Sequence, residues 1–164
     1  MKKKGVLSGL VDGAGAGLAA GVAAGLLLSI MEVKNRQGDL TWAITLASGP
    51  ARTDKLLAGW LIQLVFGTAL GVLFGLLFTA LRLRREGAAL WALGVGIAWW
   101  LVCWFALMPT GLRHAPWAEI GDPSQTQIAV AGVVAAMGYA AILAVVFAWL
   151  EQRWDERVIA QTRA

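Results

Sequence analysis

The sequence is poor in the residues that form reactive or cross-linked sites. Its 164 residues include one cysteine and one histidine, and charged residues make up only 15% of the chain. A single cysteine excludes an intramolecular disulfide scaffold, and a zinc site needs three or four ligands. No combination of nucleophile, base and ligand converges in the sequence. We therefore predict a protein that is not an enzyme, with no catalytic residues, no bound metal and no cofactor.

Apolar residues, by contrast, dominate the chain. They make up 59% of it, with 9 tryptophans and 20 glycines, and the mean hydropathy is +0.68. A soluble domain contains about 45–50% apolar and about 25% charged residues, and one soluble core of this size cannot bury so many apolar side chains. The composition predicts an integral membrane protein with a single domain over residues 1–164.

Four apolar runs are long enough to cross a bilayer, because each exceeds about 18 residues. They cover residues 5–31, 56–81, 88–108 and 128–150. We therefore predict an all-α, polytopic fold of four transmembrane helices. Between the first two runs, residues 40–46 are predicted to form a short interfacial helix.

Lysine and arginine are distributed unevenly around these runs, which predicts the orientation. With the N-terminus inside, the inner segments hold Lys2, Lys3, Lys4, Arg82, Arg84, Arg85, Arg153, Arg157 and Arg163. The outer loops hold Lys34, Arg36, Arg52, Lys55 and Arg113. Nine basic residues against five favour both termini in the cytoplasm. Basic clusters beside apolar runs are typical of anionic headgroups rather than a nucleic-acid partner.

Small residues recur every four positions in three of the predicted helices. The first helix carries Gly5, Gly9, Gly13, Gly17, Gly21 and Gly25. The second carries Gly59, Gln63, Gly67, Gly71 and Gly75, and the last carries Gly132, Ala136, Ala140, Ala144 and Ala148. Such stripes let helix backbones approach closely in lipid. We interpret them first as packing of these three helices within one chain; homo-oligomerisation or docking into a larger complex is the other interpretation, and both can hold.

Three polar residues fall at membrane depth. Asp12 is the only ionisable residue inside a predicted span, and two interpretations are open for it: handling of protons or cations, or a carboxylate near the inner interface that pairs with Thr79 or Arg82. Gln63 lies nearer the outer face, so we do not expect it to touch Asp12. Gln63 and Tyr139 each need a hydrogen-bond partner, most simply across a helix interface.

Tryptophans fall into two groups by depth. Trp91, Trp149 and Trp154 lie near span ends, where an aromatic belt is expected. The deeper tryptophans are Trp99, Trp100 and Trp104, and we expect these to serve in packing.

With this pattern in view, the chain resembles the YagU-like group of small four-helix bacterial inner-membrane proteins. The resemblance rests on the Gly- and Ala-rich first helix, on Gly59-Trp60-Leu61-Ile62-Gln63 leading into Gly67, and on Met108-Pro109-Thr110-Gly111-Leu112 followed by Pro116-Trp117-Ala118-Glu119. It implies a fold and a location rather than a reaction. Members of that group often have His where Gln63 stands and another His early in the last helix, so any metal or proton function those histidines support is not implied for this chain.

The expected function is therefore binding through contacts between membrane helices. We predict a non-catalytic membrane protein that binds the lipid bilayer and either itself or other membrane-protein helices, through the glycine stripes and the Trp-rich third helix. The alternative is a small channel or transporter for ions or small solutes that uses Asp12 and Gln63.

Overall fold

The computed structural model describes residues 6–34, 38–47, 55–81, 87–102 and 123–163, and 89% of these residues are helical. The helices are α1 (Val6–Ile30), α2 (Ala43–Leu46), α3 (Leu56–Ala80), α4 (Ala88–Val102) and α6 (Pro123–Arg163). Two short strands, β1 (Glu32–Lys34) and β2 (Leu40–Trp42), form an antiparallel hairpin. The described residues thus form an assembly of helices with one small hairpin. The hairpin was not predicted from the sequence.

Among the residues that the structure describes, three helices are long and apolar enough to cross a membrane: α1, α3 and the Thr126–Trp154 part of α6. α4 is apolar as well but is shorter over the part that the structure describes. Residues 103–108, the end of the third predicted span, lie outside the described residues. The helical content and the apolar helices agree with a membrane protein.

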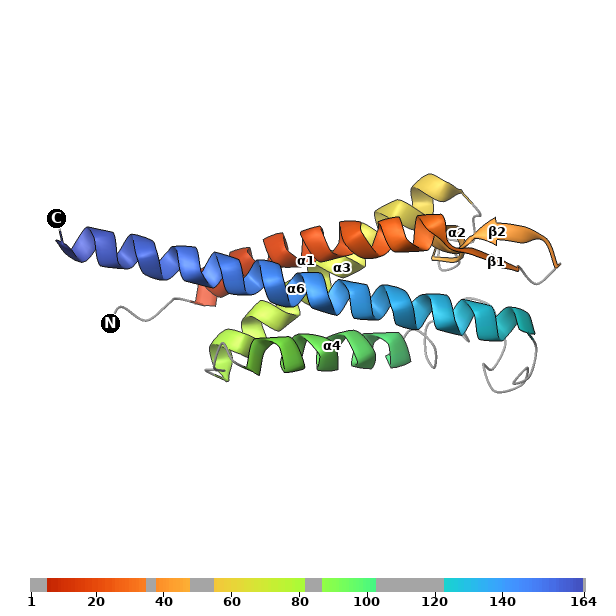
Figure 1. Cartoon of the computed structure of the whole chain (residues 1–164). Helices are drawn as coiled ribbons and strands as arrows, with labels where there is room; N and C mark the ends of the chain where they lie inside the picture. The colour runs from red at the N-terminus through yellow and green to blue at the C-terminus, as the bar shows by residue number, and fades with distance from the viewer. Residues whose placement is uncertain (1–5, 35–37, 48–54, 82–86, 103–122, 164) are drawn as a thin grey trace.

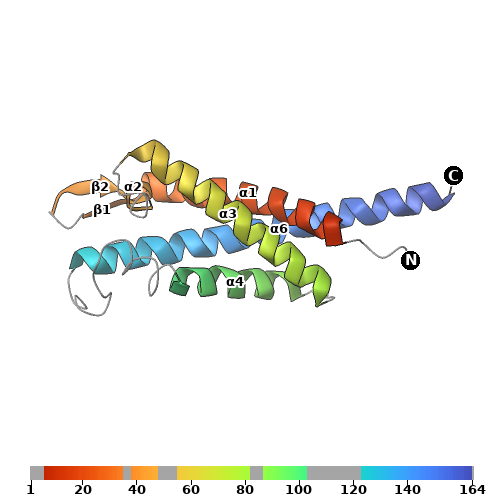
Figure 2. The ribbon, with the colours of Figure 1, turned by 180° about the vertical axis from the view of Figure 1, so that it is seen from behind.

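The helices are arranged around α6, which runs the full length of the molecule (Figure 1). α1 lies along one side of α6 and α4 along the other, and α3 crosses behind them. The view from the back shows α3 passing from the hairpin end of α1 to the start of α4 (Figure 2). The start of α1 and the C-terminal part of α6 lie on the same side of the molecule (Figure 1). α6 therefore lies between α1 and α4 and is a neighbour of both.

α6 is much longer than the predicted span of residues 128–150, because it has 41 residues. At 1.5 Å per residue it extends roughly 60 Å, well beyond a bilayer core. It starts at Pro123, and proline is favoured in a first helical turn. After the apolar run, Gln152 Nε2 donates to Glu156 Oε1 at 3.3 Å, and such i, i+4 pairs support a helix in water. Hydropathy therefore predicted the membrane-crossing part of α6 but not the end of the helix.

The connection between α1 and α3 folds as a cap on the hairpin end of the molecule. Gly38, with φ of 88°, lies between the two strands, a backbone conformation that glycine adopts without strain. Val33 is 2% exposed and packs with Ala43 and with Ala131 of α6. The backbone N–H of Lys34 donates to Gln127 Oε1 at 3.2 Å. Only the second half of the predicted interfacial helix, α2, is helical, because residues 40–42 pair with β1 instead.

The core is built from rings on one side and small residues on the other. The ring centroids of Phe74 and Phe78 in α3 lie 5.1 and 5.0 Å from that of Phe147 in α6, and 5.9 Å from each other. The buried residues that α1 adds to this core are Ala16, Ala20 and Ala24, each at most 1% exposed, and Leu28 packs against it partly buried. α1 can therefore lie close to both α3 and α6.

Candidate helix-contact site

The glycines of α1 and α3 face one another in an antiparallel series, which we call the glycine seam. Its pairs are Gly9 with Gly75, Gly13 with Gly71, Gly17 with Gly67, and Gly21 with Gln63. Both helices repeat small residues every four positions, so each turn of α1 brings the next pair together. The structure therefore places the stripes of the first two predicted helices against each other within one chain.

Contact along the seam is between backbones. A methyl group added at Gly17 would lie 2.5 Å from the carbonyl oxygen of Gly67 and 2.7 Å from the Cα of Gly71. One added at Gly67 would lie 2.8 Å from the Cα of Gly21. These neighbours are backbone atoms, which cannot rotate away as a side chain can. Close approach of this kind strengthens dispersion between helices that lipid does not drive together.

The ends of the stripes have different partners. A methyl group at Gly25 would lie 2.6 Å from the ring of Trp60. Gly59 continues the α3 spacing but faces α2 rather than α1, because its added methyl would lie 3.0 Å from the carbonyl carbon of Ile44. Ile44 is fully buried there. Gly5, the first glycine of the predicted stripe, lies outside the described residues.

The small residues of α6 contact α4. A methyl group at Gly132 would lie 3.0 Å from Nε1 of Trp100, and Gly96 of α4 lies against Ala136 and Ala140. We expected this stripe to pack with the first two helices; Gly132, Ala136 and Ala140 instead lie against α4, whereas Ala144 lies in the core that α6 shares with α1 and α3. Trp100 therefore packs over a small residue, as expected for a deep tryptophan.

Trp99, the neighbouring deep tryptophan, joins α4 to α3. Its ring lies 5.2 Å, centroid to centroid, from that of Phe66. Trp104, the third of these tryptophans, lies outside the described residues.

Tyr139 joins α6 to the seam. Its hydroxyl donates to the carbonyl oxygen of Gly67 at 2.6 Å, and the residue is only 4% exposed. The expected partner of this tyrosine is thus a backbone carbonyl of α3. Because Gly67 also contacts Gly17, one residue links α1, α3 and α6.

The structure does not bring Asp12 and Gln63 together. Asp12 is half-buried near the start of α1, whereas the backbone of Gln63 lies beside Gly21. Nine residues of helix separate Asp12 from Gly21, which is about 13 Å along the axis.

The two interpretations considered for Asp12 stay predictions. The hydroxyl of Thr79, one partner considered for Asp12, donates to the carbonyl of Gly75 at 2.8 Å, and Arg82 lies outside the described residues. Among the described residues, no group of three or more His, Cys, Asp or Glu side chains could hold a metal ion.

Sequence reasoning missed one contact at the far end of the α6 span. The guanidinium of Arg153 lies over the ring of Trp149, with Cζ 4.1 Å from the ring centroid, a cation–π arrangement. The signal was available, because residues four apart on a helix share a face.

Comparison of the chain with protein-family models, with curated proteins and with solved structures finds no match. The resemblance to the YagU-like group therefore stays a prediction. Any function must be argued from the geometry of the described residues.

Proposed function

We propose that this chain is a non-catalytic integral membrane protein that acts through helix contacts, either as a homo-oligomer or as an accessory subunit of a membrane complex. We also propose that it crosses a bacterial inner membrane four times with both termini in the cytoplasm. The beginning of α1 and the end of α6 at the same end of the bundle support an even number of crossings.

The observation that carries this proposal is an open small-residue position on the outer face of α4. No described atom lies within 4 Å of a methyl group placed at Gly94, and Ala98, one turn later, is exposed too. Large apolar side chains flank them, since Leu90 is 75% and Ile97 47% exposed. A small residue between large apolar ones is the pattern by which one membrane helix receives another.

The glycine seam supports the proposal in a different way than the sequence suggested. Its pairs are already in contact within the chain, so an outside helix would have to separate α1 from α3 to reach them. The seam holds these two helices together, and α4 presents an exposed apolar surface. Trp91, 46% exposed, adds a large amphipathic side chain to that surface.

Measurement of mass in nanodiscs, together with any co-purifying membrane protein, tests this function. We expect a dimer, a larger oligomer or a stoichiometric partner for the wild type. Gly94→Leu fills the open position and should remove that association. Ala69→Leu enlarges an exposed small residue on α3 and should leave the association unchanged.

A strictly monomeric wild type with no co-purifying partner would contradict the proposal. Equal loss of association in the Gly94 and Ala69 variants would show that the face of α4 is not the contact. The alternative of a channel or transporter predicts that proteoliposome flux falls in Asp12→Asn, and unchanged flux removes that residue from consideration.

A further inference from the structure

The end of the α6 span presents a cationic group fixed on an aromatic ring. The apolar part of α6 that can cross a membrane ends at Trp154, so Arg153 lies at the level where hydrocarbon gives way to headgroups. Trp149 and Trp154 are 48% and 37% exposed. Tryptophan favours this layer because its ring is apolar and its N–H is polar.

The position of Arg153 over one face of the Trp149 ring leaves the other sides of the guanidinium open to a ligand. A guanidinium carries five N–H donors in a planar fork, and a single ring cannot engage them all. Arg153 itself is exposed, and its Cζ lies 4.1 Å from the centroid of the Trp149 ring. Stacking restricts the long side chain before any ligand arrives, which lowers the entropy lost on binding.

The charges near Arg153 on α6 are mixed, because Glu151 and Glu156 lie on the same stretch of the helix. Gly15 of α1 lies beside this stretch, because a methyl group at Gly15 would lie 3.9 Å from Leu150, one turn before Arg153. Glu156, a nearby carboxylate, already accepts from Gln152 at 3.3 Å.

We propose that Arg153, held on Trp149, binds the phosphate of an anionic phospholipid headgroup. Guanidinium and phosphate match in shape, since two parallel N–H groups can donate to two phosphate oxygens. A free phosphate ion offers the same oxygens, but the position at the end of a span, between exposed tryptophans, favours a phosphate attached to acyl chains. This inference depends on the location of the chain in a membrane but not on the proposed helix contacts.

Lipid titration of the purified full-length chain in non-ionic detergent tests the site. Short-chain phosphatidylglycerol, phosphatidylcholine and inorganic phosphate are added separately, and the thermal unfolding midpoint is followed by circular dichroism. We expect phosphatidylglycerol to raise the midpoint more than phosphatidylcholine does, and phosphate to leave it unchanged. In Arg153→Gln, the half-saturating concentration of phosphatidylglycerol should rise about fivefold, the usual effect of one basic residue near an anionic surface.

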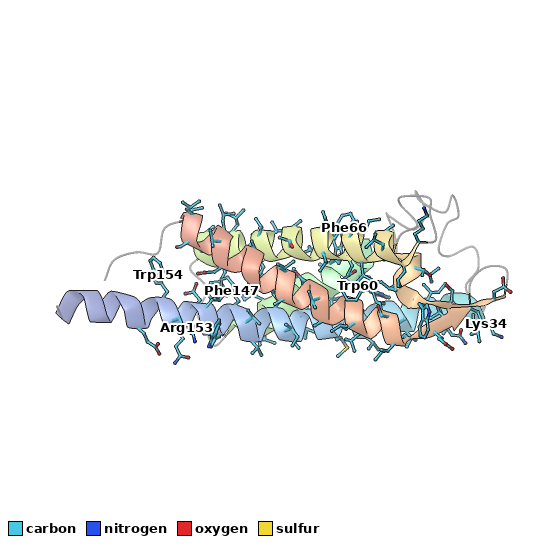
Figure 3. The ribbon with its side chains drawn as sticks, turned by 90° about the horizontal axis from the view of Figure 1, so that it is seen from above. Lys34, Trp60, Phe66, Phe147, Arg153 and Trp154 are labelled. Carbon is cyan, nitrogen blue, oxygen red and sulfur yellow. The ribbon has the colours of Figure 1, made fainter. Side chains whose placement is uncertain are left out.

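Two further variants make the test specific. Lys34→Gln removes one positive charge at the opposite end of the bundle (Figure 3); the Lys34 contact described above uses only its backbone N–H, and this variant should respond as the wild type does. Arg153→Lys keeps the charge but loses the planar group and the paired donors, so its response should lie between those of wild type and Arg153→Gln.

Three results would overturn the inference. The first is a wild-type response to phosphatidylglycerol in Arg153→Gln or Arg153→Lys. The second is an equal loss in Lys34→Gln, which would indicate net charge rather than a site. The third is protection by inorganic phosphate equal to that by lipid, which would assign the site to a soluble anion.

Discussion

Two helix contacts in this molecule use small residues in different ways. In the glycine seam between α1 and α3, glycine faces glycine and the atoms in contact belong to the two backbones. In the contact between α4 and α6, Gly96 lies against the backbone of Ala136, but Gly132 faces a side chain, the ring of Trp100. The seam brings backbone atoms together, whereas at Gly132 a large ring fills the space that a missing side chain leaves.

This difference predicts unequal tolerance to the same chemical change. A backbone atom can move only with its whole helix, so a new methyl group in the seam must push α1 away from α3. A tryptophan ring can instead shift by a few tenths of an ångström at modest cost. Spacing of small residues therefore identifies contact faces, but only the identity of the opposing atoms decides how strictly glycine is required.

The largest effect is expected for Gly71→Ala, in the middle of the seam. An added methyl group would meet the carbonyl oxygen of Gly13 and lie 2.7 Å from the backbone nitrogen of Gly17. We expect a loss of about 3 kcal/mol in unfolding free energy, at the upper end for overpacked cores, because both neighbours are backbone. Unfolding in mixed micelles, followed by circular dichroism, measures it.

The matched control lies in the same seam. At Gly21, the nearest atoms to an added methyl group are 3.5 Å away, an ordinary contact distance, so Gly21→Ala should change the unfolding free energy by less than about 0.5 kcal/mol. Equal losses in the Gly71 and Gly21 variants would contradict the assignment of the cost to backbone overlap.

A smaller effect is expected for Gly132→Ala, in the contact between α4 and α6. The added methyl group would lie 3.0 Å from Nε1 and 3.2 Å from Cδ1 of Trp100, so the ring must move slightly. We expect a loss of about 1 kcal/mol, the lower end for overpacking, measured in the same unfolding experiment. A loss as large as that of Gly71→Ala would show that the two contacts are equally rigid and remove the distinction between them.

The sequence predicted the parts of this comparison that depend on local repetition. A four-residue period in residues 9–25 and 67–75 places glycines on one ridge of each helix, and two such ridges on neighbouring antiparallel helices can meet in register. It could not predict that Gly59 faces Ile44, because the fold of the α1–α3 connection depends on docking against α3 and α6. Nor could it predict the length of α6, because hydropathy marks the end of the bilayer and not the end of a helix.

For polar residues, the sequence predicted that a partner is needed but mostly not which residue supplies it. Tyr139 had to find a hydrogen-bond acceptor in an apolar environment, but nothing in the spacing pointed to the carbonyl of Gly67. The contact of Arg153 with Trp149 lies at the other extreme, because four-residue spacing on one helix is visible in the sequence.

A smaller loss than that of Gly132→Ala is expected for Tyr139→Phe, which tests how α6 is held on the seam. The change removes the 2.6 Å hydrogen bond to Gly67 while keeping the ring in place. Because that carbonyl lies within α3 and can still accept from the helix backbone, no acceptor is left unpaired. We expect a loss of about 0.6 kcal/mol, the average for hydrogen bonds between membrane helices.

Combined with Gly71→Ala in a double-mutant cycle, Tyr139→Phe should show a non-zero coupling energy, since the hydrogen-bond acceptor and the overpacked glycine are one helical turn apart on α3. Strict additivity of the two losses would mean that Tyr139 holds α6 independently of how closely α1 and α3 approach.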